Sequence, residues 1–111
     1  MTDYCVIYTT TPTEEMAKKI AEALVSSHLV ACVNYYPANS VYYWKGQVME
    51  EKEHILMCKT LNARFKEIEA KIKAIHSYEC PEILALKITN GSRDYLNWVF
   101  DSTKQHEEGV Y

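Results

Sequence analysis

The segment of residues 76–82 holds the side chains of this sequence that are best suited to bind a metal ion. It reads His-Ser-Tyr-Glu-Cys-Pro-Glu, and its potential ligands are His76, Glu79, Cys80 and Glu82. Imidazole and thiolate suit copper or zinc, whereas carboxylates alone suit harder divalent cations. The spacing is not that of a structural zinc site, so a closed site of four ligands within one subunit is not expected. We predict an open site centred on His76, which a second subunit could complete.

A structural interpretation of the same segment stays open. His76 would end a helix, where a cation favours the helix dipole, Cys80 would be buried, and the two glutamates would form ion pairs. Catalysis by Cys80 with His76 is a weaker alternative, because their mutual geometry does not follow from closeness in sequence. The chain has no G-x-S-x-G, Walker A or G-x-G-x-x-G motif and only three glycines. We therefore expect no enzymatic activity.

Composition and charge indicate the number of domains, the class of partner and the cellular location that we expect. The 111 residues are 48% hydrophobic, which predicts one domain over residues 1–103 followed by a polar tail over 104–111. The formal net charge is −3 with both signs interspersed, so no nucleic-acid partner is expected. No leader or membrane span is apparent, which predicts a cytoplasmic protein without a membrane partner. The four cysteines lack a C-x-x-C pair and are expected to be reduced thiols, most of them acting as small hydrophobes.

Periodic apolar residues predict the elements that must position residues 76–82. Amphipathic helices are expected over residues 14–26 and after Asn62, which is a plausible N-cap, and a short last helix is expected from Ser92 or Asp94. Strands are expected over residues 4–10, 29–36 and 82–88. Pro37 and the turn-prone residues 38–40 are expected to interrupt the chain after the second strand.

Residues 41–60 read as a long β-hairpin. Tyr42, Tyr43 and Trp44 favour strands, and Gly46 supplies the positive φ that short hairpin turns require. This length exceeds the needs of a small sheet, so the far end is expected to project and to pack on another subunit.

The resulting order β-α-β-β-α-β, followed by a short helix, predicts an α+β protein of the ferredoxin-like class with a four-stranded antiparallel sheet. Its two crossover helices cover only one face. Because the first and last strands carry apolar residues on both faces, we expect the second face to be covered in a symmetric homo-oligomer.

Taken together, several segments of the chain resemble the CutA divalent-cation-tolerance family. They are Ala31-Cys32-Val33-Asn34, Tyr42-x-Trp44-x-Gly46, Lys59-Thr60, His76-x-Tyr78-Glu79-x-Pro81-Glu82-Ile83 and Tyr95-Leu96-x-Trp98. The resemblance extends to about Ser102. It implies a homotrimer of ferredoxin-like subunits joined by their hairpins, tolerance to copper and other divalent cations, and copper binding in some members.

The sequence departs from the family at the proposed copper ligands. In the branch where they have been proposed, these are a Cys at the end of the first strand and two adjacent His before the Tyr-containing loop. The matching positions here hold Thr9, Ile75 and His76. Of these three residues, only His76 has a side chain suited to bind copper. A copper site here would therefore be weaker or would recruit Cys80 or Cys5.

The leading hypothesis is a homotrimer that binds divalent metal, copper foremost, and contributes to metal tolerance. The alternative is a regulatory trimer whose inter-subunit cleft, lined by residues such as Trp44, Lys59 and Tyr78, binds a small organic ligand and signals to an unidentified protein partner. A purely structural trimer is the third possibility. Residues 106–108 (His-Glu-Glu) of the tail are expected to bind metal only adventitiously.

Overall fold

The computed structural model describes residues 3–104. Beyond Lys104, the predicted tail, including residues 106–108, lies outside the described residues. The elements are β1 (Tyr4–Thr11), α1 (Glu14–Ser26), β2 (Cys32–Trp44), β3 (Gln47–Leu61), a 3-10 turn (Asn62–Arg64), α2 (Phe65–Ile75), β4 (Ile83–Lys87) and α3 (Arg93–Ser102). This order confirms the predicted β-α-β-β-α-β arrangement with a short last helix.

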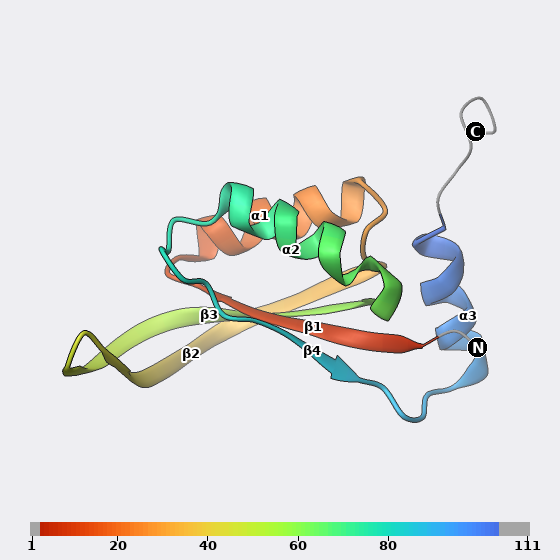
Figure 1. Cartoon of the computed structure of the whole chain (residues 1–111). Coiled ribbons are helices and arrows are strands. Elements are labelled where there is room, and N and C mark those ends of the chain that lie inside the picture. Colours follow the sequence, from red (N-terminus) through yellow and green to blue (C-terminus); the bar gives the residue numbers. More distant parts are fainter. Residues whose placement is uncertain (1–2, 105–111) are drawn as a thin grey trace.

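The four strands form one antiparallel sheet in the order β2-β3-β1-β4. Helices α1 and α2 lie side by side on one face of this sheet, and the other face is open (Figure 1). The predicted ferredoxin-like fold is confirmed. The core lies between the sheet and the two helices, where its fully buried members include Ile7, Ile20, Leu24, Leu56, Ile68 and Ile72.

Two cysteines belong to this core. Cys5 and Cys58 are 1% and 0% exposed, and burial raises their thiol pKa values to about 11 and about 12. All four cysteines are free thiols. Cys5 and Cys58 therefore act as the small hydrophobes that the sequence predicts.

Two of the three predicted helix starts are confirmed in detail. The Thr13 hydroxyl accepts the Met16 amide at 3.1 Å at the start of α1, and the Ser92 hydroxyl accepts the Tyr95 amide at 3.3 Å at the start of α3. The prediction that Asn62 caps the second helix is wrong, because a 3-10 turn precedes α2 and no side chain caps either of them. The Asn62 amide donates instead to the Asp3 carbonyl at 2.9 Å, which ties this residue to the start of β1.

The predicted break at Pro37 is also wrong. Strand β2 continues from Cys32 to Trp44 and pairs with β3 over its whole length. Proline, which lacks an N–H donor, is tolerated because β2 is an edge strand whose outer side needs no partner. The strand starts at Cys32 rather than at residue 29, since the amides of Leu29 and Val30 still donate to the Leu24 carbonyl at the end of α1.

The hairpin of β2 and β3 projects beyond the rest of the sheet. The pairing of β1 with β3 ends at His54, whereas residues 38–44 and 47–53 pair only with each other. These seven pairs form a two-stranded arm, hereafter the hairpin arm, roughly 24 Å long at 3.4 Å per residue. Lys45 and Gly46 turn it with φ of 50° and 81°, the positive values of a type I′ turn. Figure 1 shows the arm reaching past the helical layer.

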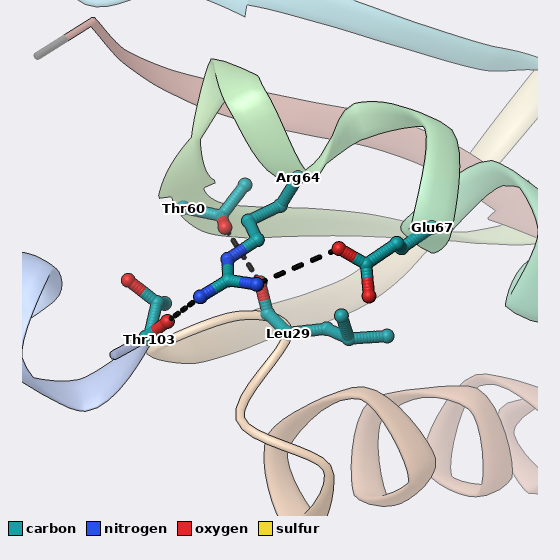
Figure 2. Close-up of polar contacts among 5 residues, drawn as sticks. All are labelled: Leu29, Thr60, Arg64, Glu67 and Thr103. Carbon is teal, nitrogen blue, oxygen red and sulfur yellow. Dashed lines mark hydrogen bonds and ion pairs between the residues drawn. The ribbon is translucent and has the colours of Figure 1, made fainter. Parts of the chain in front are cut away.

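Helix α3 lies at the opposite end of the molecule from the tip of the hairpin arm (Figure 1). Its C-terminal end is held by Arg64, whose guanidinium donates to the carbonyl of the buried Thr103 and lies 3.5 Å from the Glu67 carboxylate. Figure 2 shows these contacts beside the 2.6 Å hydrogen bond from the Thr60 hydroxyl to the Leu29 carbonyl. Within residues 3–104, no helix is both long and apolar enough to cross a membrane.

Candidate functional site

A cavity of about 450 Å³ lies between the hairpin arm and the loop of residues 76–82. Its lining residues are Thr10, Tyr42, Trp44, Glu51, Glu53, Ser77, Tyr78, Glu79, Cys80 and Glu82. Side chains alternate between the faces of a strand, so Glu51 and Glu53 share one face of β3, and Tyr42 and Trp44 share one face of β2. Residues of β1, of both strands of the hairpin and of the loop therefore meet at this site.

His76 fixes the loop that forms one wall of the cavity. Its Nδ1 accepts the Tyr78 amide at 3.1 Å, and its Nε2 lies 2.7 Å from the Thr10 carbonyl oxygen at the end of β1. Because an amide can only donate and a carbonyl can only accept, the ring must carry its proton on Nε2. Both ring nitrogens are thus engaged with the backbone. Coordination of a metal by His76 would have to replace one of these bonds, and this role stays a prediction.

Two tyrosines hold the carboxylates of β3. The Tyr78 hydroxyl donates to Glu53 Oε2 at 2.7 Å, and the Tyr42 hydroxyl donates to Glu51. Glu53 is only 6% exposed. Burial and then the bond to Glu53 raise the pKa of Tyr78, while the bond to Glu51 is the main cause that raises the pKa of Tyr42 to about 12. At neutral pH both phenols therefore keep the protons that they donate.

Glu51 and Glu53 were not among the site residues predicted from the sequence. The available signal was their period-two spacing on one strand of a hairpin whose other strand carries aromatic residues. That spacing places the two carboxylates on one face, but it does not show that the loop of residues 76–82 covers this face.

Three of the four predicted metal ligands line the cavity, namely Glu79, Cys80 and Glu82. All three are exposed, so the structural interpretation that buries Cys80 is wrong. The Glu79 carboxylate lies 3.9 Å from Lys45 Nζ, with both side chains more than 70% exposed. Over residues 3–104, no group of three or more His, Cys, Asp or Glu side chains is placed to hold a metal ion. The described residues of a single subunit therefore do not fit a resident metal.

The residues predicted to line an inter-subunit cleft divide into two groups. Trp44 and Tyr78 line the cavity. Lys59 lies on β3 where that strand pairs with Val6 and Cys32, six residues from Glu53 and hence roughly 20 Å along the strand. Within one subunit, Lys59 is therefore separated from the other two.

Comparisons with known proteins agree over most of the chain. The chain is 44% identical over 99 residues to the divalent-cation tolerance protein CutA of Thermus thermophilus. The aligned residues cover 88% of this chain and 96% of that relative. It is 41% identical over 100 residues to the chloroplastic protein CutA of Arabidopsis thaliana, covering 89% of this chain and 55% of that longer relative. It thus spans about half of the plant protein.

Solved structures show the same fold. The periplasmic divalent cation tolerance protein CutA of Archaeoglobus fulgidus superposes with a TM-score of 0.90 at 35% identity, covering 91% of this chain and 99% of that one. CutA1 of Oryza sativa gives a TM-score of 0.90 at 37% identity, covering 94% and 96%. The family described as CutA1 divalent ion tolerance protein matches residues 5–102. With this match, these identities and this fold, the chain belongs to the CutA1 divalent ion tolerance family.

Proposed function

We propose that this protein binds divalent metal ions, copper foremost, and in this way contributes to divalent-cation tolerance. Membership of the CutA1 family, several of whose members are named for that tolerance, is the observation that carries the proposal. The exposed thiol of Cys80 and the neighbouring carboxylates of Glu79 and Glu82 supply suitable donor atoms at the mouth of the cavity. Thiolate suits copper, and carboxylates suit harder ions.

We further propose that the metal site forms between subunits of a homotrimer. On the open face of the sheet, Leu84 is 52% exposed and Leu86 is 48% exposed. On the hairpin arm, the exposed apolar side chains include Val41, Tyr43 and Val48. Apolar surface of this kind favours association. A second subunit would also supply the further ligands that one subunit does not bring together.

A competition titration tests the metal proposal. The full chain, carrying His106→Ala, Glu107→Gln and Glu108→Gln to remove adventitious binding, is titrated with Cu(I), Cu(II) and Zn(II) against a chelator. We expect binding tighter than that of free histidine, and we expect Cys80→Ser to weaken it. Light scattering on the same sample should give the mass of three subunits. Binding no tighter than that of free histidine would contradict the metal function.

His76 is tested in the same titration by His76→Ala. If His76 is a ligand, this variant loses metal affinity by direct loss of a donor atom. If it only anchors the loop, the metal-free protein loses thermal stability, and metal affinity falls no further than in a variant that loosens the loop from the other side, Tyr78→Phe.

A second function is favoured by the size and lining of the cavity. Its volume of about 450 Å³ lies within the usual range of pockets for small organic ligands, and Trp44 and Tyr78 supply aromatic surface. We propose as the alternative that the trimer binds such a ligand and reports it to a partner protein. Thermal shifts across a metabolite panel, with metals chelated, test this alternative.

Neither function makes or breaks a covalent bond, so we propose that the protein is not an enzyme. We also propose that it resides in the cytoplasm, where its free cysteines would stay reduced.

A further inference from the structure

We propose that the cavity between the hairpin arm and the loop of residues 76–82 binds a protonated organic diamine or polyamine. The inference deepens the second function proposed above and rests on it, because it names the chemical class of the organic ligand. It follows from the charge of the cavity, the unfilled acceptor capacity of its carboxylates, and the aromatic rings beside them.

The charge of the cavity is strongly negative. Among the lining residues that the structure describes are four glutamates and no lysine or arginine. Lys45 forms an ion pair with one of these glutamates, but its 3.9 Å contact with Glu79 joins two exposed side chains and so neutralises little. Glu51, Glu53 and Glu82 take part in none of the ion pairs found within residues 3–104. A concave surface lined by one sign of charge concentrates counter-ions of the other sign.

The inner carboxylates keep acceptor capacity for such a counter-ion. A carboxylate offers about four acceptor positions on its two oxygens. Tyr78 supplies one donor to Glu53, and Tyr42 supplies one to Glu51. Glu53 is 6% exposed, so solvent reaches little of it, and a buried carboxylate is stable only when it is well paired. An ammonium group has three N–H donors and a positive charge, so it can fill the free acceptor positions and also pair with the buried negative charge.

The aromatic walls suit the remainder of an organic cation. Trp44 already faces an ammonium group of the chain itself, since Lys45 Nζ lies 5.7 Å from the centre of its ring, within the range of a cation–π contact. The rings of Tyr42 and Tyr78 also line the cavity and can pack against a methylene chain. A metal ion, by contrast, needs several ligand atoms at about 2.0–2.6 Å, and the described residues of one subunit do not provide three.

Calorimetric titration of the full chain tests the inference, with metals chelated and at physiological ionic strength. The probes are 1,4-diaminobutane and spermidine, and the matched neutral probe is 1,4-butanediol, which has the same carbon chain without charge. We expect saturable binding of both amines and none of the diol. An absence of saturable amine binding would overturn the inference. A lysine of a neighbouring subunit that filled the cavity would give this result. Equal binding of the diol would do the same.

Two single substitutions locate the binding. Glu51→Gln removes a carboxylate of the cavity, and its amide oxygen can still accept from Tyr42, so the fold is kept. Glu22→Gln changes the net charge equally on the outer face of α1, where Glu22 is exposed. We expect roughly tenfold weaker amine binding in Glu51→Gln, as for one lost charge-assisted contact, and no change in Glu22→Gln. An equal loss in both variants would show nonspecific attraction and would refute the site.

Lys45→Gln separates a cationic ligand from an anionic one. Removing the lysine frees the face of Trp44 and leaves Glu79 unpaired, so amine binding should strengthen several-fold, whereas an anion would bind less well. If the amines fail while a neutral or anionic metabolite stabilises the protein in a way that Trp44→Ala abolishes, this inference falls and the regulatory function stands. If no metabolite binds, both fall.

Discussion

Replacing Tyr78 by Phe should destabilise the protein, because the buried carboxylate of Glu53 loses a hydrogen-bond donor. The substitution keeps the ring in place and deletes only the hydroxyl that donates to Glu53 Oε2 at 2.7 Å. Glu53 is 6% exposed, so water does not readily replace the lost donor. A hydrogen bond to a charged group contributes about 1.5–3 kcal/mol. Because Tyr78 itself is half-buried, we expect a loss of about 1–2 kcal/mol in the free energy of unfolding per subunit.

Equilibrium unfolding in guanidinium chloride at one fixed protein concentration measures this loss. In a Glu53→Gln background the partner is neutral, so Tyr78→Phe should cost about half as much, since charge-assisted hydrogen bonds are roughly twice as strong as neutral ones. Tyr42→Phe is the matched control, with a smaller cost because Glu51 is more exposed than Glu53. A Tyr78→Phe variant as stable as the unchanged protein, or one with equal costs in both backgrounds, would refute the assigned role of this bond.

Three further predictions concern other parts of the molecule. Arg64→Met should release the C-terminal end of α3 and cost about 1–3 kcal/mol, with faster amide exchange in α3, whereas Lys66→Met at an exposed position should change neither. The pKa of Tyr42 is raised to about 12, chiefly by its bond to Glu51. The folded state thus holds this proton more tightly than the unfolded chain. Stability is therefore complete below the ordinary tyrosine pKa of about 10 and should fall as the pH rises toward 12; Tyr42→Phe should lower the amplitude of the late phase in an absorbance titration of tyrosinate, to which Tyr78 and Tyr95, whose pKa values are also raised, still contribute. A thiol reagent should modify the exposed Cys80 rapidly, the partly exposed Cys32 more slowly, and the buried Cys5 and Cys58 only on unfolding; a fast phase of unchanged amplitude in Cys80→Ser would contradict this.

Much of the fold could be predicted from the sequence because its signals are local. The bounds of α1, the Ser92 cap and the Gly46 turn each depend on residues within a few positions of one another. Asn62 and Pro37 are the exceptions. Their local preferences were overruled by pairing with the start of β1 and by the edge position of β2, which are properties of the assembled sheet.

The candidate site could be predicted only in part. The sequence indicated the loop of residues 76–82, together with Trp44 and Tyr78, because unusual side chains gather there or match a family pattern. It did not indicate Glu51 and Glu53, since their part in the site depends on how β3 pairs and where the loop crosses.

By itself, the sequence determined the order of the elements, the family and the chemical types of the groups near the loop. Only the tertiary structure decided what those groups contact. It joined His76 to the Thr10 carbonyl, 66 positions away, and Tyr78 to Glu53, 25 positions away. The physical reason is that hydrogen bonds and burial act over a few ångströms, whereas the residues that share them are brought together by the register of strands and the path of a loop.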